Sequence, residues 1–326
     1  MNQVASNHTD ETGAGDRRRT LKPTPPFFIV GFQRSGTTML RMMLNAHPDI
    51  AIPHDSGELW PSYWRTMVGR EFQIESLVDE LLRDPRVVAW KVDLDREDLL
   101  AEPRPASFAQ LMARFHEAFA RVHGKRCWGD KNTGTLVELD HLNRMFPDCR
   151  IIHLVRDGRD CALSHGSKEY VYGYENLLRS ATEWRDQVTL CHKMGGMLPS
   201  ERFLELRYED LLAAPEQGLR RICTFLGVEY SERMLGYHHQ VDKFVPPEKR
   251  GLWPLLDQPP VAANAYKWKR TMKAVDRAIF ERNAGALLRE FGYETLPVPV
   301  REGRLREVWY QFHSRWSWRF HRSTKK

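Results

Sequence analysis

The segment FFIVGFQRSGTTML, residues 27–40, constrains the fold of this chain more than any other part of the sequence. Its apolar run ends at Gly31, a polar turn follows, and Gly36 then precedes two threonines and a helical pattern. A strand, a tight turn and a helix in this order point backbone N–H groups and the positive end of a helix at one place. The segment therefore predicts a binding site for a phosphate or a similar oxyanion.

The loop in this segment differs from a nucleotide-binding P-loop in one residue type. The P-loop GxxxxGK[ST] has a lysine directly after its second glycine, whereas Thr37 follows Gly36 here. Arg34 supplies a positive charge inside the loop, where a guanidinium can bridge two oxygens of a phosphate or sulfate, and Thr37 and Thr38 add hydroxyl donors. We expect a phosphosulfate, because a transferable sulfonate carries less charge than a γ-phosphate and can be handled without magnesium.

Short apolar runs rich in β-branched residues alternate with helical patterns, which is typical of an α/β fold with a parallel β-sheet flanked by helices. Strands are expected at 27–32, 88–92, 150–155 and 202–206, and another in RCWGD before Lys131. The apolar spacing predicts helices over FAQLMARFHEAFARV, LVELDHLNRMF and EQGLRRICTFLGV, and a helix over KRTMKAVDRAIFERNAGALLREFG that ends at Gly292. Proline-rich residues 241–263 predict a flexible linker or an active-site lid.

The composition and the chain ends predict the domain organisation. With 326 residues, 41% of them hydrophobic, the chain can bury one substantial core, which we place at 27–300. Residues 1–26 are polar, lack an apolar signal region and are expected to be a disordered N-terminal segment. The five cysteines form no CxxC pair and indicate reduced, mostly buried thiols. Since no apolar run approaches the roughly 20 residues that span a bilayer, we expect a cytoplasmic protein.

The net charge of +6 lies in the last 26 residues, because residues 301–326 hold eight Lys or Arg and two Glu. A neutral body argues against a nucleic-acid-binding protein. Apolar and basic side chains recur around this segment at helical spacing, which predicts a basic amphipathic helix with aromatic anchors. Such a helix can contact an anionic membrane peripherally, dock on the body of the protein or on the second subunit of a homodimer, or remain a disordered tail.

A second segment, RIIHLVRDGRDCALSHGSK at 150–168, reads as a buried strand, a polar turn and a helix. Arg156 ends the strand and Ser164 follows eight residues later. If the helix begins near Gly158, Ser164 faces back toward Arg156, and the pair can hold a second phosphate. Taken alone, RDGRD can also be an ordinary charged turn.

Together these two segments resemble the PAPS-dependent sulfotransferases, in particular the protein-tyrosine sulfotransferase and bacterial branches, over about residues 27–270. The resemblance implies a sulfotransferase fold related to nucleotide kinases, with 3′-phosphoadenosine-5′-phosphosulfate (PAPS) as the donor, PAP as the product and no metal. It implies that Arg156 and Ser164 bind the 3′-phosphate. It implies that the 5′-phosphosulfate is bound by Arg34, Ser35, Gly36, Thr37 and Thr38.

The reaction also needs a general base, and several residues are candidates. HPDIAIPHDSGEL offers His54, Asp55 and Glu58, and CWGDKN offers Asp130. We prefer His54 or Asp55, with Asp55 at about the position of a glutamate in the tyrosine sulfotransferases. Each carboxylate can also be an ordinary surface or capping group.

Four further residues are expected near the donor. Lys131 is expected to contact the sulfonate and to act in catalysis with Arg34. YKWKRTM resembles a segment that brings a lysine, here Lys267, to the nucleotide, and Arg250 of EKRG has a weaker resemblance of the same kind. Tyr208 is expected beside the nucleotide or in the core.

Two other classes of protein remain open. A P-loop kinase or NTPase would also use such a loop, but GK[ST] is missing and Arg156 stands at the end of the strand RIIHLV, where a magnesium-binding acid would be sought. A non-catalytic docking module is the second alternative. The acceptor, a hydroxyl or amine of a small molecule, a lipid-linked compound, a peptide or a carbohydrate, cannot be identified from the fold.

Overall fold

The computed structural model describes residues 24–54, 59–67, 73–131, 138–166, 176–245, 247–297, 304 and 306–310. Within these residues, a five-stranded sheet has the order β2-β3-β1-β4-β5, and every pair of neighbouring strands is parallel. This confirms the α/β fold with a parallel sheet. The strands are β1 (Phe27–Val30), β2 (Ile50–Ala51), β3 (Cys127–Lys131), β4 (Arg150–Val155) and β5 (Phe203–Arg207).

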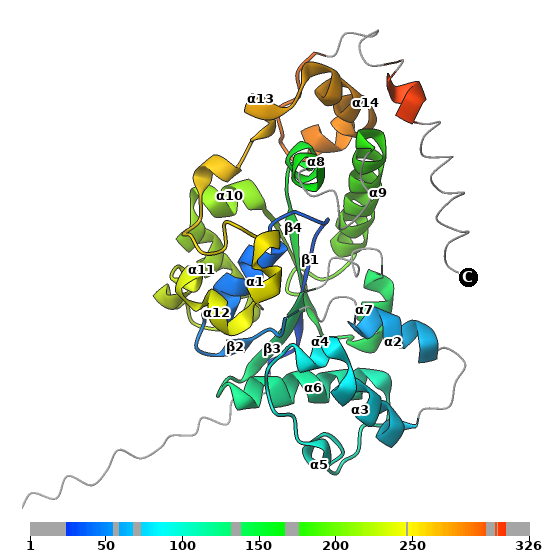
Figure 1. The fold of residues 1–326 in the computed structure, drawn as a ribbon, viewed down its shortest axis with the longest axis vertical. Helices are drawn as coiled ribbons and strands as arrows, with labels where there is room; N and C mark the ends of the chain where they lie inside the picture. Colours follow the sequence, from blue (N-terminus) through cyan, green and yellow to red (C-terminus); the bar gives the residue numbers. More distant parts are fainter. Residues whose placement is uncertain are drawn as a thin grey trace, which may run out of the picture.

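Helices cover both faces of the sheet, with α1, α11 and α12 on one side and α6, α7 and α9 on the other (Figure 1). The helices that precede β4 are α1 (Thr37–Asn45), α2 (Leu59–Met67), α3 (Ile74–Arg83), α4 (Pro85–Val88), α5 (Arg96–Leu99), α6 (Phe108–Val122) and α7 (Leu139–Met145). Those that follow it are α8 (Gly158–Gly166), α9 (Leu177–Gly196), α10 (Tyr208–Ala213), α11 (Pro215–Leu226), α12 (Val241–Phe244), α13 (Trp268–Thr271) and α14 (Ala274–Glu290).

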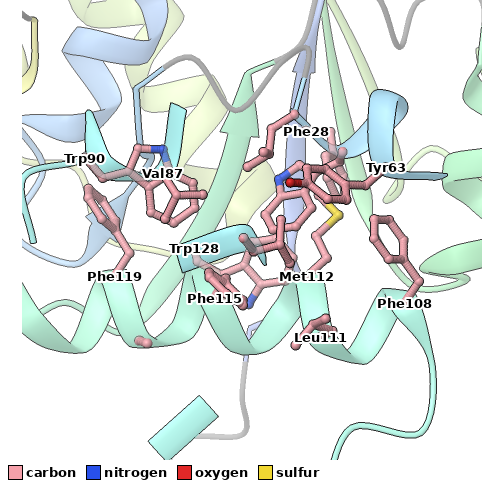
Figure 2. Close-up of a cluster of buried hydrophobic side chains, with 14 of the residues drawn as sticks. Phe28, Tyr63, Val87, Trp90, Phe108, Leu111, Met112, Phe115, Phe119 and Trp128 are labelled. Atoms are coloured by element: carbon pink, nitrogen blue, oxygen red, sulfur yellow. The ribbon is translucent and has the colours of Figure 1, made fainter. Parts of the chain in front are cut away.

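Side chains of the central strand β1 pack into two hydrophobic clusters, because successive side chains of a strand point to opposite faces of the sheet. Phe28 and Val30 pack into a cluster with α6 and neighbouring helices, part of which is drawn in Figure 2. Phe27 and Ile29 pack into a second cluster with α1 and α11. With both faces of β1 buried, the loop that follows it is fixed at the middle of the carboxyl edge of the sheet.

The predicted strand at 88–92 is wrong. Helix α4 ends at Val88, residues 89–90 form a turn, and residues 91–92 have no regular secondary structure. Asp84 and Pro85 start this helix, since the Asp84 carboxylate accepts a hydrogen bond from the Arg86 backbone N at 2.8 Å and proline occupies the first helical turn. An apolar run of four residues does not by itself distinguish a strand from a buried helical turn.

The helix over FAQLMARFHEAFARV and the strand at 150–155 are found with the expected ends, and the strands at 27–32 and 202–206 with ends shifted by one or two residues. The helix over FAQLMARFHEAFARV is α6, and the strand in RCWGD is β3. The single helix expected up to Gly292 is two helices, α13 and α14, with a break at residues 272–273. Strand β2 has only two residues and was not predicted. All five cysteines are buried and free, as expected.

The described part of the C-terminal segment docks on the body. Residues 306–310 are helical, and Tyr310 is buried against Leu178 and Ile279. The Nδ2 atom of Asn176 donates a hydrogen bond to the Tyr310 carbonyl oxygen at 2.7 Å, and Arg306 forms an ion pair with Asp276 at 3.0 Å. The first 23 residues and residues 311–326 lie outside the described part of the chain. Among the helices that are described, none has the length and hydropathy of a membrane span.

Candidate functional site

The loop after β1 has the geometry of an anion-binding turn. Ser35 N donates to the Phe32 carbonyl oxygen at 3.0 Å, and α1 begins directly after Gly36, which has φ 93°. A Cβ atom on Gly36 would lie 2.4 Å from the ring of Tyr208, and one on Gly31 would lie 2.6 Å from the Leu154 carbonyl oxygen. Both glycines are therefore required by close packing, and Gly36 also by its left-handed backbone.

Two distant sequence motifs meet at this loop. The Nε atom of Arg34 donates to Oγ of Ser164 at 2.9 Å, and Nη1 of Arg156 donates to the Arg34 carbonyl oxygen at 3.0 Å. The helix α8 begins at Gly158, as expected, which turns Ser164 back toward the end of β4. The residues expected to hold the two phosphates thus form one continuous hydrogen-bonded unit.

Arg156 is only 5% exposed and has a specific set of neighbours. Its Nη2 atom donates to the Asn264 carbonyl oxygen at 2.9 Å, and its guanidinium lies 4.6 Å from the centre of the Tyr208 ring. The nearest Asp160 carboxylate oxygen is 3.7 Å away. Its Nε atom is buried and has no hydrogen-bond partner among the described residues. A buried guanidinium with an unused donor suits an anionic ligand.

A cavity of about 430 Å³ opens over this unit, within the range of small-molecule sites. Residues of the two motifs form its polar wall, and Trp253, Pro254, Leu255 and Leu256 form an apolar wall. The proline-rich segment is thus a wall of the cavity and not a remote linker. The residues predicted for the site that line the cavity are Arg34, Gly36, Thr37, Thr38, Lys131, Arg156, Ser164, Tyr208 and Lys267.

The remaining predicted site residues either do not line the cavity or lie outside the described residues. The Ser35 side chain is buried below the loop, with Oγ 3.7 Å from Sγ of Cys161. Arg250 forms an ion pair with Asp242 and is not part of the cavity lining. Asp55 and Glu58 lie outside the described residues.

Of the described base candidates, neither His54 nor Asp130 lines the cavity. The ring of His54 lies edge-to-face against the indole of Trp253, 6.1 Å between centroids, and Trp253 does line it. Asp130 and Lys131 point to opposite faces of β3, so that Lys131 reaches the cavity while Asp130 is 1% exposed. One Asp130 oxygen accepts from the Lys131 backbone N at 2.7 Å.

Several residues that line the cavity were not predicted from the sequence. Asn264 donates through Nδ2 to the hydroxyl oxygen of Tyr208 at 2.6 Å and lines the cavity beside it. Asp160, Met39, Leu163 and Thr271 also line it. The proline-rich segment before Asn264 and YKWKRTM after it drew attention to this region but not to Asn264 itself, and nothing in RDGRD separates Asp160 from its charged neighbours.

The electrostatics of the cavity favour a multiply charged anion. Its described lining includes four cationic side chains, those of Arg34, Lys131, Arg156 and Lys267, against the single carboxylate of Asp160. Burial, with a contribution from Arg156, lowers the pKa of Lys267, and burial raises the pKa of Asp160. Burial and the charge of Arg34 lower the pKa of nearby His165 to about 4. Among the described residues, no group of three or more His, Cys, Asp or Glu side chains could hold a metal ion.

Comparisons with known proteins agree with this geometry. Residues 25–232 match the model of the sulfotransferase family. The chain is 30% identical over 242 residues to protein-tyrosine sulfotransferase 2 of Gallus gallus, covering 73% of this chain and 58% of that protein. This chain therefore spans less than two thirds of that relative's length.

Two solved structures share the fold. The sulfotransferase domain of the Synechococcus PCC 7002 olefin synthase has a TM-score of 0.59 and 24% identity, covering 84% of this chain and 96% of that domain. The sulfotransferase domain of the curacin biosynthetic pathway has a TM-score of 0.57 and 20% identity, covering 83% and 99%. With the family model matching more than half of its length, this chain belongs to the sulfotransferase family.

Proposed function

We propose that this protein transfers a sulfuryl group from PAPS to a hydroxyl or amine of an acceptor. The observation that carries the proposal is the single hydrogen-bonded unit of Arg34, Ser164 and Arg156 at one cavity. Two cationic sites joined in this way fit a nucleotide with two separate anionic groups, which PAPS has and ATP lacks.

The residues present fit this donor. The loop between Gly31 and Thr38 would hold the 5′-phosphosulfate through its backbone N–H groups, the Arg34 guanidinium and the threonine hydroxyls. Arg156 and Ser164 would hold the 3′-phosphate, and the unused Nε of Arg156 is an available donor. The apolar wall and Tyr208 would cover the nucleoside.

The donor supplies a sulfonate whose bond to the bisphosphate breaks as the new bond to the acceptor forms. The bridging oxygen gains negative charge as this bond breaks, so fixed donors there lower the barrier. Arg34, Thr37 and Lys131 line the cavity and would serve as those donors. A base removes the acceptor proton, and we propose that it belongs to the pair His54 and Asp55, at the end of the segment that follows β2.

The direct test is transfer of label from PAPS labelled with ³⁵S to a panel of phenols, alcohols, amines, carbohydrates and tyrosine-containing peptides. The proposal expects one or more labelled products together with stoichiometric PAP. Binding of PAP without transfer to any member of a broad panel would instead support a docking module. ATP hydrolysis or phosphoryl transfer dependent on Mg²⁺ would support the kinase or NTPase alternative.

We also propose that the C-terminal segment brings the enzyme to an anionic membrane surface. Its described start is anchored through Tyr310, while Val308 is 47% and Trp309 57% exposed. The following sequence adds aromatic residues and a surplus of arginine and lysine, a composition suited to such surfaces. Deletion after Tyr310 should abolish salt-sensitive binding to vesicles containing phosphatidylserine while leaving transfer to a small acceptor intact. Full-length protein that does not bind these vesicles at low salt would contradict the proposal.

A further inference from the structure

Asp160 is an unexpected residue for an anion-binding cavity. Of the described residues that line the cavity, it alone carries a negative charge, and it is 1% exposed. A carboxylate this close to Arg156 repels a phosphate on the same guanidinium and weakens its binding. Asp160 is therefore expected to have a role other than direct binding of the anion.

The Asp160 carboxylate holds a segment more than 100 residues away in the sequence. Its Oδ1 atom accepts from the Trp268 backbone N at 2.8 Å, and its Oδ2 atom accepts from the Lys267 backbone N at 3.2 Å. These two N–H groups begin helix α13, whose first turn otherwise has no side-chain cap. Hydrogen bonds to an ionised acceptor are stronger than those to a neutral one.

The backbone that Asp160 holds is strained. Tyr266 has φ 53°, a left-handed conformation that is unfavourable for a residue other than Gly, Asn or Asp. Such a conformation persists only where the surroundings fix it. Besides the carboxylate of Asp160, the contacts that hold Tyr266 include a hydrogen bond from Nη2 of Arg207 to its hydroxyl at 3.0 Å and one from the Lys269 backbone N to its carbonyl oxygen at 3.2 Å.

This strained turn places two groups of the cavity. On its N-terminal side, the Asn264 carbonyl oxygen accepts from Nη2 of Arg156 at 2.9 Å. On its C-terminal side, Lys267 lines the cavity. The geometry of the turn thus sets the distance between Arg156 and the second cation that would meet the bisphosphate.

We propose that Asp160 is a positioning residue for donor binding. It holds residues 264–268 closed against the Arg156 end of the cavity, so that Lys267 is in place before a nucleotide enters. The preorganisation gained in this way outweighs the repulsion between the carboxylate and the phosphate. The part of the inference that concerns the nucleotide rests on the proposed function, whereas the holding of the turn does not.

The test is Asp160→Asn, which keeps the shape of the side chain but removes its charge and one acceptor. In the ligand-free variant, the Lys267 and Trp268 amides should exchange their hydrogens about tenfold faster or more, with exchange in β4 unchanged. The dissociation constant for PAP should rise about tenfold, while kcat at saturating PAPS stays within about twofold. The matched control is Asp140→Asn, the same change at an exposed carboxylate of α7, which should alter none of these quantities.

Three results would overturn the positioning role. They are unchanged exchange at both amides, unchanged affinity for PAP, and a fall of kcat at saturating donor without a change in affinity, which would place Asp160 in the chemistry. If Asp160→Asn does not fold, Asp160→Glu moves the carboxylate by one methylene and should give the same faster exchange. Wild-type protein that binds no PAP would contradict the proposed function, and the exchange measurement would still decide whether Asp160 holds the turn.

Discussion

The Nε atom of Arg34 donates a hydrogen bond to Oγ of Ser164 at 2.9 Å, across 130 residues of sequence. Arg34 belongs to the loop after β1, and Ser164 to the helix after β4. Because β1 and β4 are adjacent and parallel, their carboxyl ends bring both loops to the same edge of the sheet. The two proposed sites for anionic groups are thus positioned by one pair of neighbouring strands.

Arg34→Ala should reduce turnover more than donor binding. Its guanidinium is expected to stabilise the charge that develops as the sulfonate leaves, and loss of one such donor typically costs about 10²–10³ in kcat. The measurement is kcat at saturating PAPS, with exposed Arg104 replaced by alanine as the control. Full turnover in Arg34→Ala would remove this residue from the chemistry.

Arg156→Ala should mainly weaken the nucleotide complex. Charged hydrogen bonds of the kind this buried side chain can make contribute about 1.5–3 kcal/mol each, so the dissociation constant for PAP should rise by about tenfold to a hundredfold. Calorimetry with PAP and with adenosine 5′-phosphate, which lacks the 3′-phosphate, separates the two anionic sites. The variant should lose affinity for PAP only; an equal loss for both nucleotides would place Arg156 at the 5′ site.

Gly36→Ala should impair both stability and nucleotide binding. The new Cβ atom would meet the Tyr208 ring at 2.4 Å while φ stays near 93°. Gly124→Ala is a matched control, because Gly124 has φ 64° and open space around its Cβ position. The control measures only the free-energy cost of placing alanine in a left-handed backbone conformation, which is about 1 kcal/mol. Chemical denaturation should show a larger loss for Gly36→Ala than for the control. Equal losses, with PAP binding retained, would mean that the loop can move away from Tyr208.

His165 should make the folded state sensitive to acid. Burial first, and Arg34 second, lower its pKa from 6.5 to about 4, so the folded protein keeps it neutral where the unfolded chain is protonated. The resulting contribution to stability is present above pH 6.5 and is lost as the pH falls toward 4, by an amount on the order of 3 kcal/mol.

Replacing His165 by glutamine should therefore flatten the dependence of the unfolding free energy on pH between pH 6.5 and pH 4. The control is His239→Gln, which changes an exposed histidine. A slope that His165→Gln leaves unchanged would show that other groups cause the acid sensitivity.

Local sequence patterns were sufficient for the parts of the site that lie in one segment. Short-range spacing predicts the strand, glycine turn and helix at 27–40, and also the strand and helix at 150–166. The contact between the two loops follows because their strands are adjacent and parallel. The contact between Asp160 and residues 267–268 has no local signal, because it depends on how α13 packs on α8. The strand predicted at 88–92 was wrong because Asp84 and Pro85 start helix α4, which ends at Val88 and is followed by a turn at 89–90.

The most direct measurement compares how PAP and ATP with Mg²⁺ stabilise the native protein against thermal unfolding. A ligand that binds only the folded state adds about 2.7 kcal/mol at a hundredfold excess over its dissociation constant. Because Arg156 and Ser164 form a separate site joined to the Arg34 loop, PAP should stabilise the protein at micromolar concentrations and ATP with Mg²⁺ much less. Stabilisation by ATP with Mg²⁺ that equals or exceeds that by PAP would contradict the assignment of this cavity to a sulfuryl donor.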